Sequence, residues 1–149
     1  MKIFIGTDHA GFELKNQLLG HLADKGCEVI DAGPFTFEKT DDYPDYAYQV
    51  ATKVIGEADE DQTRGILICT SGQGMAIAAN RVPGIRAALA WDKESAKHSR
   101  QHNNANVLSL PGKRLSYEQA VEVIDAWLDE KFTKEERHIR RLGKIDNLG

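Results

Sequence analysis

Cys69 occupies a position in this sequence from which a thiol could take part in a reaction. It ends an apolar run, residues 65–69, and precedes a short segment that opens an amphipathic stretch. Glycines let a backbone approach a ligand closely, and N–H groups at the start of a helix bind anions and favour a thiolate. Cys69 could therefore act as a base or a nucleophile, while the alternative, a small buried strand residue, stays open. The segment consists of Thr70, Ser71, Gly72, Gln73 and Gly74.

Two further pairs of side chains suited to proton transfer stand at the ends of predicted elements. Asp8 and His9 follow the first apolar run, residues 2–6. His102 and Asn103 end an amphipathic stretch, where an imidazole could donate a proton or simply interact with the last carbonyls of a helix.

Arg137 and Arg141 are four residues apart, so they project from one helical face and could hold an anion together. Alternatively, the two arginines lie on a solvent-exposed helix face, where neighbouring acidic side chains offset their charge. Taken with the thiol, the acid and the imidazoles, the arginines indicate acid–base chemistry on a phosphorylated, polyhydroxylated substrate without a cofactor.

Neither a metal site nor a nucleotide site is predicted. His98 and His102 are four residues apart, but no Glu stands between them as in zinc proteases, and no third ligand is evident. Segment 70–74 lacks the Lys of a phosphate-binding loop, and Ile77 stands where a dinucleotide fingerprint needs its third glycine. The net charge of −4 argues against nucleic-acid binding, which requires a surplus of Lys and Arg.

The composition is that of a soluble globular protein, with 41% hydrophobic and 28% charged residues in a chain of 149. The first apolar run is too short for a signal peptide, and no apolar stretch reaches the roughly 18 residues of a membrane span. The two cysteines, Cys27 and Cys69, form no metal-binding or disulfide pattern. We therefore expect a cytoplasmic protein that does not associate with membranes.

Short β-rich runs alternate with longer amphipathic stretches, which predicts βα units around a parallel sheet. The runs are rich in Ile, Val and Leu, as expected when helices cover both faces of the sheet. The prediction is a three-layer α/β/α, Rossmann-like fold with a five-stranded parallel sheet, forming one domain over residues 1–149 with a C-terminal helical segment at about 133–147. The expected strands are residues 2–6, 27–31, 65–69, 85–90 and 106–110. The expected helices are residues 12–24, 46–55, 74–81, 93–101, 117–131 and 135–144.

A set of ordered motifs runs along nearly the whole chain. Through them the sequence resembles the ribose-5-phosphate isomerase B group and its relatives, the galactose-6-phosphate isomerase subunits. Some members of that group use a Glu as base at the position of Met75, so this chain is similar to the members that use a cysteine. The motifs are residues 6–12, 42–44, 69–74 with 77–80, 83–88, 99–103 with 106–108, and Arg137-His138 with Arg141.

The resemblance implies a homodimer that interconverts ribose 5-phosphate and ribulose 5-phosphate through an enediolate, without metal or cofactor. Cys69 would take the proton from C2 of the aldose, and His102 would be the acid that helps to open the furanose ring. Asp8 and Asn103 would bind the sugar, and the backbone of residues 70–74 would stabilise the enediolate. The implied phosphate contacts are His9, Arg114, Arg137 and Arg141.

The predicted topology separates Cys69 from His102. Cys69 ends a strand, whereas His102 ends a helix that leads into the next strand and so lies at the opposite edge of the sheet. A strand of about five residues at roughly 3.3 Å each separates the edges by about 16 Å. If both residues act on one substrate, His102 comes from a second chain across a two-fold interface, and such dimers could pair into tetramers.

Two other functions remain as alternatives. One is isomerisation of a six-carbon sugar phosphate such as allose or galactose 6-phosphate, although the galactose relatives tend to lack the Asp-His and His-Asn pairs found here. The other is a nucleotide- or metabolite-binding module on the same architecture, which would need the complete phosphate loop that this chain lacks.

Overall fold

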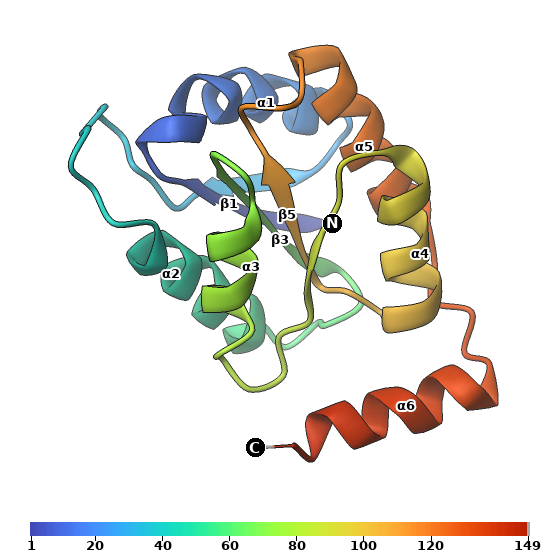
Figure 1. The fold of residues 1–149 in the computed structure, drawn as a ribbon. Helices are drawn as coiled ribbons and strands as arrows, with labels where there is room; N and C mark the ends of the chain where they lie inside the picture. Colours follow the sequence, from blue (N-terminus) through green and yellow to red (C-terminus); the bar gives the residue numbers. More distant parts are fainter. Residues whose placement is uncertain (149) are drawn as a thin grey trace.

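A five-stranded parallel sheet forms the centre of the computed structural model, which describes residues 1–148 (Figure 1). The strands lie side by side in the order β2-β1-β3-β5-β4, so the strands that precede Asp8 and Cys69 are neighbours. The predicted parallel sheet is confirmed. The strands are β1 (Lys2–Thr7), β2 (Glu28–Asp31), β3 (Thr63–Cys69), β4 (Ala87–Leu89) and β5 (Val107–Pro111).

Helices cover both faces of the sheet, which confirms the three-layer arrangement (Figure 1). Along β3 the side chains alternate between two cores, with Ile66 and Ile68 in one and Leu67 and Cys69 in the other. The core of Ile66 includes residues of α1 (Phe12–Asp24), α4 (Lys93–Asn103) and α5 (Tyr117–Asp129). The core of Cys69 includes residues of α2 (Tyr43–Gly56) and α3 (Gln73–Ala79).

A last helix, α6 (Glu136–Asp146), lies outside the three layers beside the end of α4 (Figure 1). The linker before it is attached to α4 by Thr133, whose N–H and hydroxyl both donate to the Gln101 carbonyl at 3.1 and 3.0 Å. At its other end, Asp146 pairs with Arg86 at 3.5 Å. The orientation of α6 is therefore set by contacts at both of its ends.

Most predicted boundaries differ from the structure by one or two residues, and those of α2 and β4 differ for a clear physical reason. α2 begins at Tyr43 rather than at residue 46, because Pro44 lies in its first turn, where a missing N–H costs nothing. β4 covers only residues 87–89 of the predicted strand 85–90, because it is an edge strand that pairs with β5 alone. No helix among residues 1–148 combines the length and apolar character needed to cross a membrane.

Lys15 is fully buried although its side chain carries a charge. Its Nζ donates to both carboxylate oxygens of Asp31 at 2.7 Å and to the Pro34 carbonyl at 2.8 Å. An ammonium group has three donors, so all of them are used. These bonds join α1 to the end of β2 and to the start of the loop that follows, residues 32–42.

Replacing Lys15 with Met is expected to destabilise the fold by about 3 kcal/mol, because it leaves a partly buried carboxylate and a buried carbonyl without their donor. Urea unfolding followed by circular dichroism measures the change. Lys53→Met, at an exposed position on α2, is the matched control and should cost about 0.5 kcal/mol or less. Equal losses for the two variants would show that the buried ion pair does not matter for stability.

Candidate active site

The carboxyl edges of β1 and β3 bring two of the predicted groups together. The strands pair in parallel with Thr7 opposite Ile68, and the Thr7 hydroxyl donates to the Ile68 carbonyl at 2.8 Å. Asp8 and Cys69 each follow directly after this pair. The structure therefore places the Asp-His pair and the cysteine loop at one edge of the sheet, where open parallel sheets bind their ligands.

Cys69 is buried, with 6% of the residue exposed, and its side chain belongs to the core under α2 and α3. Its Sγ also accepts a hydrogen bond from the Gly72 N–H at 3.2 Å. Cys69 therefore fits both interpretations of the sequence. It is a packed strand residue, and its thiol accepts a hydrogen bond from a backbone N–H. The backbone N–H would stabilise a negative charge on this sulfur.

Close packing determines the shape of the segment after Cys69. Gly72 has φ +74°, and a Cβ there would lie 2.5 Å from Leu89 Cδ1 and 3.0 Å from the Leu110 carbonyl carbon. The Ser109 hydroxyl donates to the Gly72 carbonyl at 2.6 Å. A Cβ at Gly74 would lie 2.7 Å from the Tyr43 ring. Glycine is therefore required at position 72, a side chain at position 74 would displace the Tyr43 ring, and the segment is held from the β5 side and from the α2 side.

The turn after β5 reaches the same edge. Gly112 donates its N–H to the Cys69 carbonyl at 2.8 Å, and Lys113 donates to the Thr70 carbonyl at 3.2 Å. A Cβ at Gly112 would lie 2.7 Å from Ile68 Cγ2, so this approach also depends on glycine. Arg114 follows two residues later with an exposed side chain, which places a cation beside the cysteine loop.

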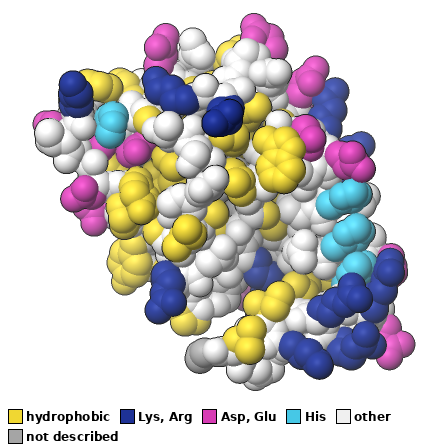
Figure 2. Space-filling view, viewed as in Figure 1, with side chains coloured by type: hydrophobic (Ala, Val, Ile, Leu, Met, Phe, Trp, Pro, Cys, Tyr) yellow, Lys and Arg dark blue, Asp and Glu magenta, His cyan; other side chains and the backbone are white. Residues whose placement is uncertain are grey.

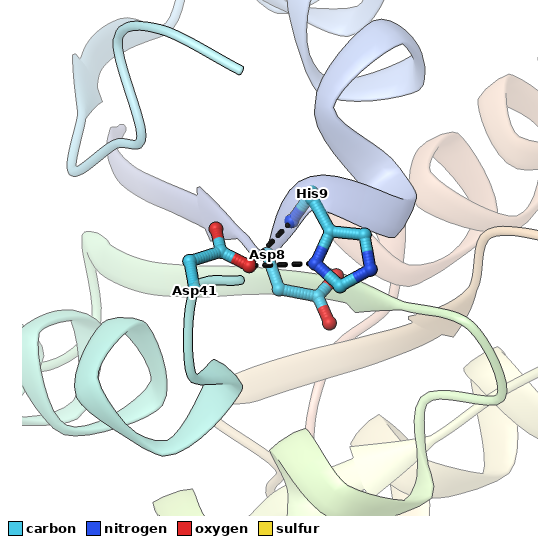
Figure 3. Close-up of side chains that lie close together, drawn as sticks. All are labelled: Asp8, His9 and Asp41. Atoms are coloured by element: carbon cyan, nitrogen blue, oxygen red, sulfur yellow. Dashed lines mark hydrogen bonds and ion pairs between the residues drawn. The ribbon is translucent and has the colours of Figure 1, made fainter. Parts of the chain in front are cut away.

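His9 is held by Asp41, a residue that the sequence analysis did not single out (Figure 3). One carboxylate oxygen of Asp41 lies 2.7 Å from His9 Nδ1 and 3.1 Å from the His9 backbone nitrogen. An Nδ1–H that donates to this oxygen leaves Nε2 free to face a ligand. The sequence offered only an indirect signal, because Asp41 lies in residues 33–44, the longest stretch that the sequence predicts to be irregular, and such loops are often functional.

Asp8 caps the short 3-10 helix η1 (His9–Gly11), and its Oδ1 accepts from the Ala10 N–H at 3.0 Å. Burial raises the pKa of the Asp8 carboxyl, and the nearby Asp41 charge acts in the same direction against the Ala10 hydrogen bond and the His9 charge. Asp8 therefore pays a desolvation cost when ionised. Such a cost is common where a carboxylate is kept for binding or catalysis.

Asp8, His9 and Asp41 each place one potential ligand atom within 4.8 Å of the others, which is close enough for a metal ion. However, the Asp41 oxygen nearest to His9 already accepts two hydrogen bonds from that residue. This hydrogen bonding accounts for the approach of His9 to Asp41, whereas the second carboxylate oxygen of Asp41 is buried and makes no hydrogen bond within residues 1–148.

The other predicted site residues lie at the amino edge of the sheet, around the end of α4. The His102 ring stacks on His138 of α6 at a centroid distance of 4.6 Å and on His98 at 5.0 Å, with interplanar angles of 17°. In Figure 2 the imidazoles form a row next to the basic side chains of α6. Asn103 is exposed beside this row.

Arg137 and Arg141 are both exposed on α6, but they do not form a free pair. The Arg137 Nε donates to Glu135 at 2.9 Å, so one of the two guanidinium groups is engaged. His138 between them is buried, and its Nε2 makes no hydrogen bond. Burial and the Arg137 charge lower the pKa of His138, which favours a neutral ring in the stack.

The candidate residues of one chain thus form two groups at opposite edges of the sheet. The thiol, the Asp-His pair and Arg114 lie at the carboxyl edge, and His102, Asn103 and the two α6 arginines lie at the amino edge.

Comparison with known proteins gives consistent matches over nearly the whole chain. Residues 3–145 match the family described as Ribose/Galactose Isomerase. The chain is 46% identical over 145 residues to ribose-5-phosphate isomerase B of Escherichia coli (strain K12), covering 97% of this chain and 93% of the relative. It is 41% identical over 142 residues to ribose-5-phosphate isomerase B of Mycolicibacterium paratuberculosis, covering 95% and 87%.

Solved structures agree in fold. A crystal structure of a ribose 5-phosphate isomerase from Thermotoga maritima matches with a TM-score of 0.92 and 45% identity, covering 99% of this chain and 98% of that one. The ribose-5-phosphate isomerase B of Mycoplasma genitalium with bound ribulose-5-phosphate matches with a TM-score of 0.92 and 42% identity, covering 97% and 93%.

Asp8→Asn is expected to stabilise the folded protein near neutral pH. A raised carboxyl pKa means that the ionised form is disfavoured in the fold, so the cost is present above the raised pKa and disappears below the ordinary value of 3.8. Asn keeps an oxygen that can accept from Ala10. Urea unfolding at neutral and at acidic pH tests this.

The control is Asp42→Asn, an exposed position whose side chain makes no cap hydrogen bond. The gain from Asp8→Asn should shrink as the pH falls, and the control should show no such trend. If Asp8→Asn raised the free energy of unfolding equally at both pH values, burial of the ionised Asp8 carboxyl would not be what destabilises the fold.

Proposed function

The chain belongs to the Ribose/Galactose Isomerase family, and from this premise we propose that it interconverts ribose 5-phosphate and ribulose 5-phosphate. The observation that carries the proposal is the full-length similarity to a protein whose structure holds ribulose-5-phosphate. The site geometry supports it, because a thiol, buried backbone donors and phosphate-binding cations are the groups that such an isomerisation uses. We place this activity in the cytoplasm.

In the proposed reaction, Cys69 as thiolate removes the proton from C2 of the open-chain aldose, which leaves an enediolate. Return of that proton to C1, with a proton shift between the two oxygens, gives the ketose, so atoms and electrons balance without a cofactor. We assign the stabilisation of the enediolate to the backbone of residues 70–74, where each N–H directed at the developing oxyanion can contribute roughly 3–4 kcal/mol. The hydrogen bond from Gly72 to Cys69 Sγ supports the thiolate form of the base.

The remaining site residues are assigned to binding and ring opening. His102 is the acid that helps to open the furanose ring, and Asp8 and Asn103 bind the sugar. The Asp41 contact supports His9 as a phosphate ligand, because it leaves Nε2 free for the phosphate. The proposed phosphate ligands are His9, Arg114, Arg137 and Arg141.

The two separated groups of residues support a homodimer with active sites shared between chains. β4 is an edge strand whose residues are only half-buried, and edge strands of native proteins are usually covered. Figure 2 shows hydrophobic side chains gathered over this side of the molecule and along α6. A second copy that covered this surface would exclude it from water and could bring its own α6 to the cysteine loop. The exposed side chains there include Ile77, Trp91, Ile139 and Ile145.

The family also contains isomerases of six-carbon sugars, so allose and galactose 6-phosphates are the alternative substrates. A coupled assay of aldose-to-ketose conversion on five- and six-carbon phosphates distinguishes them. A clear preference for a six-carbon substrate would overturn the pentose assignment.

Cys69→Ala should abolish turnover while leaving substrate affinity nearly unchanged, because proton abstraction is a transition-state role. The measurement is kcat with ribose 5-phosphate, together with substrate binding by calorimetry. Cys27→Ala, at a half-buried position away from this loop, is the control and should keep its kcat. If Cys69→Ala retained more than about a tenth of the wild-type kcat, a barrier change under about 1.4 kcal/mol, the base would have to be another group.

Mixing two inactive variants, Cys69→Ala and His102→Ala, should restore activity under conditions where subunits exchange. A mixed dimer would hold one site with both native residues and one with neither. Random exchange makes half of the dimers mixed, so about a quarter of the wild-type activity should return. Native mass spectrometry verifies the exchange. Verified exchange without activity would mean that each site is built from a single chain.

A further inference from the structure

Two buried arginines, Arg64 and Arg100, lie at the amino edge of the sheet without an acidic partner. Arg64 is the second residue of β3 and Arg100 is in the last turn of α4, and the two residues are 7% and 5% exposed. Within residues 1–148, neither guanidinium has a carboxylate oxygen within 4.0 Å. Buried charges in proteins are normally paired.

The contacts of each arginine involve only one of its nitrogens. Arg100 Nη1 donates to Asn104 Oδ1 at 2.9 Å and to the Ala105 carbonyl at 2.7 Å. Arg64 Nη1 donates to the carbonyls of Glu60 and Thr63 at 2.8 and 2.7 Å. A guanidinium has five N–H donors, so Nε and Nη2 of both remain available. Neither appears among the buried unpaired atoms of residues 1–148, so they face open space.

That space is a cavity of about 310 Å³ whose wall contains both arginines. Gln62, Asn104 and Lys131 also line it, so further donors surround the guanidinium groups. The volume is at the lower end of the range for small-molecule sites, which is roughly 300–1,000 Å³. Planar guanidinium groups with free Nε and Nη2 are suited to bidentate binding of oxyanions.

The charges around the cavity favour an anion at its buried end. Burial lowers the pKa of Arg100 to about 10, and the positive charges of Arg64 and Arg86 add to this effect, while Asp61 and Glu130 act against it. Arg86 has a carboxylate partner in Asp146, which Arg64 and Arg100 lack. The acids of the cavity wall are Asp61 and Asp129, which are exposed, and Glu130, which is half-buried. A bound oxyanion would compensate two charges that the fold itself leaves unpaired.

We propose that Arg64 and Arg100 bind the phosphate group of inorganic phosphate or of a small phosphate monoester, in a site distinct from the one around Cys69. The inference does not depend on the proposed isomerase activity. Arg100 also holds the turn directly after His102 and Asn103 through Asn104 and Ala105. A ligand on Arg100 would therefore stiffen the helix end that carries two of the candidate site residues.

Arginine Nε–H resonances of the full-length protein, recorded by ¹⁵N NMR during titration, report directly on this cavity. Arg64→Lys and Arg100→Lys assign the two signals. Both signals should shift saturably with inorganic phosphate and with glycerol 3-phosphate, and not with sodium chloride at the same ionic strength. If the shifts saturated with glycerol 3-phosphate but not with inorganic phosphate, the cavity would be a site for phosphate monoesters. Absence of shifts with either probe, or equal shifts with chloride, would overturn the proposal.

Substitutions at the exposed rim test the site without disturbing buried charges. Asp61→Asn should tighten phosphate binding and Lys131→Ala should weaken it, each by about twofold to fivefold, the range of exposed charge interactions. Lys53→Ala, exposed on α2 and outside the cavity, should change nothing. Arg141→Ala should leave both resonance shifts intact. Loss of the shifts in Arg141→Ala, or no response to either rim variant, would show that phosphate acts from another site.

Discussion

The pairing of β1 with β3 is the interaction on which the rest of the site depends. It sets Thr7 opposite Ile68, so the next residues of the two strands, Asp8 and Cys69, lie side by side at one edge of the sheet. The close approach of the surrounding turns depends on the same contact. A Cβ at Gly11 would lie 2.3 Å from Thr7 Oγ1 and 2.5 Å from Ile68 Cγ2. Small residues thus let the backbone reach the strand ends, and a larger residue there would force the loops apart.

A second set of contacts brings the loop after β2 over this edge. Lys15 holds Asp31 and Pro34 at the loop's start, and Asp41 holds His9 at its end. Between them the Phe37 ring contacts the edges of the His9 and Phe12 rings, at centroid distances of 6.3 and 6.0 Å. The loop is therefore attached at both ends and in the middle, which explains how an irregular segment can position an imidazole.

The division of the candidate site residues between the two edges of the sheet follows from the βα topology. Loops after strands and loops after helices lie at opposite edges, so a single chain cannot assemble the thiol and the α4–α6 cluster around one sugar. In the proposed homodimer this separation would be overcome, because a two-fold axis can bring the amino-edge group of one chain to the carboxyl-edge group of the other. The same topology places Arg64 and Arg100 at the amino edge, away from the thiol and close to the end of α4.

The sequence by itself determined the layers, the helix over residues 12–24 and the grouping of Cys69 with residues 70–74, because periodicity, apolar runs and glycine spacing are local properties. It also placed His102 at the opposite edge, since chain direction alone decides that. Only the tertiary structure showed that Asp41 holds His9, that His138 stacks on His102 and that Arg64 and Arg100 share a cavity. Each of these contacts joins residues at least 32 positions apart. They arise from strand order and side-chain packing, and no local pattern of residue types encodes which distant side chains will meet.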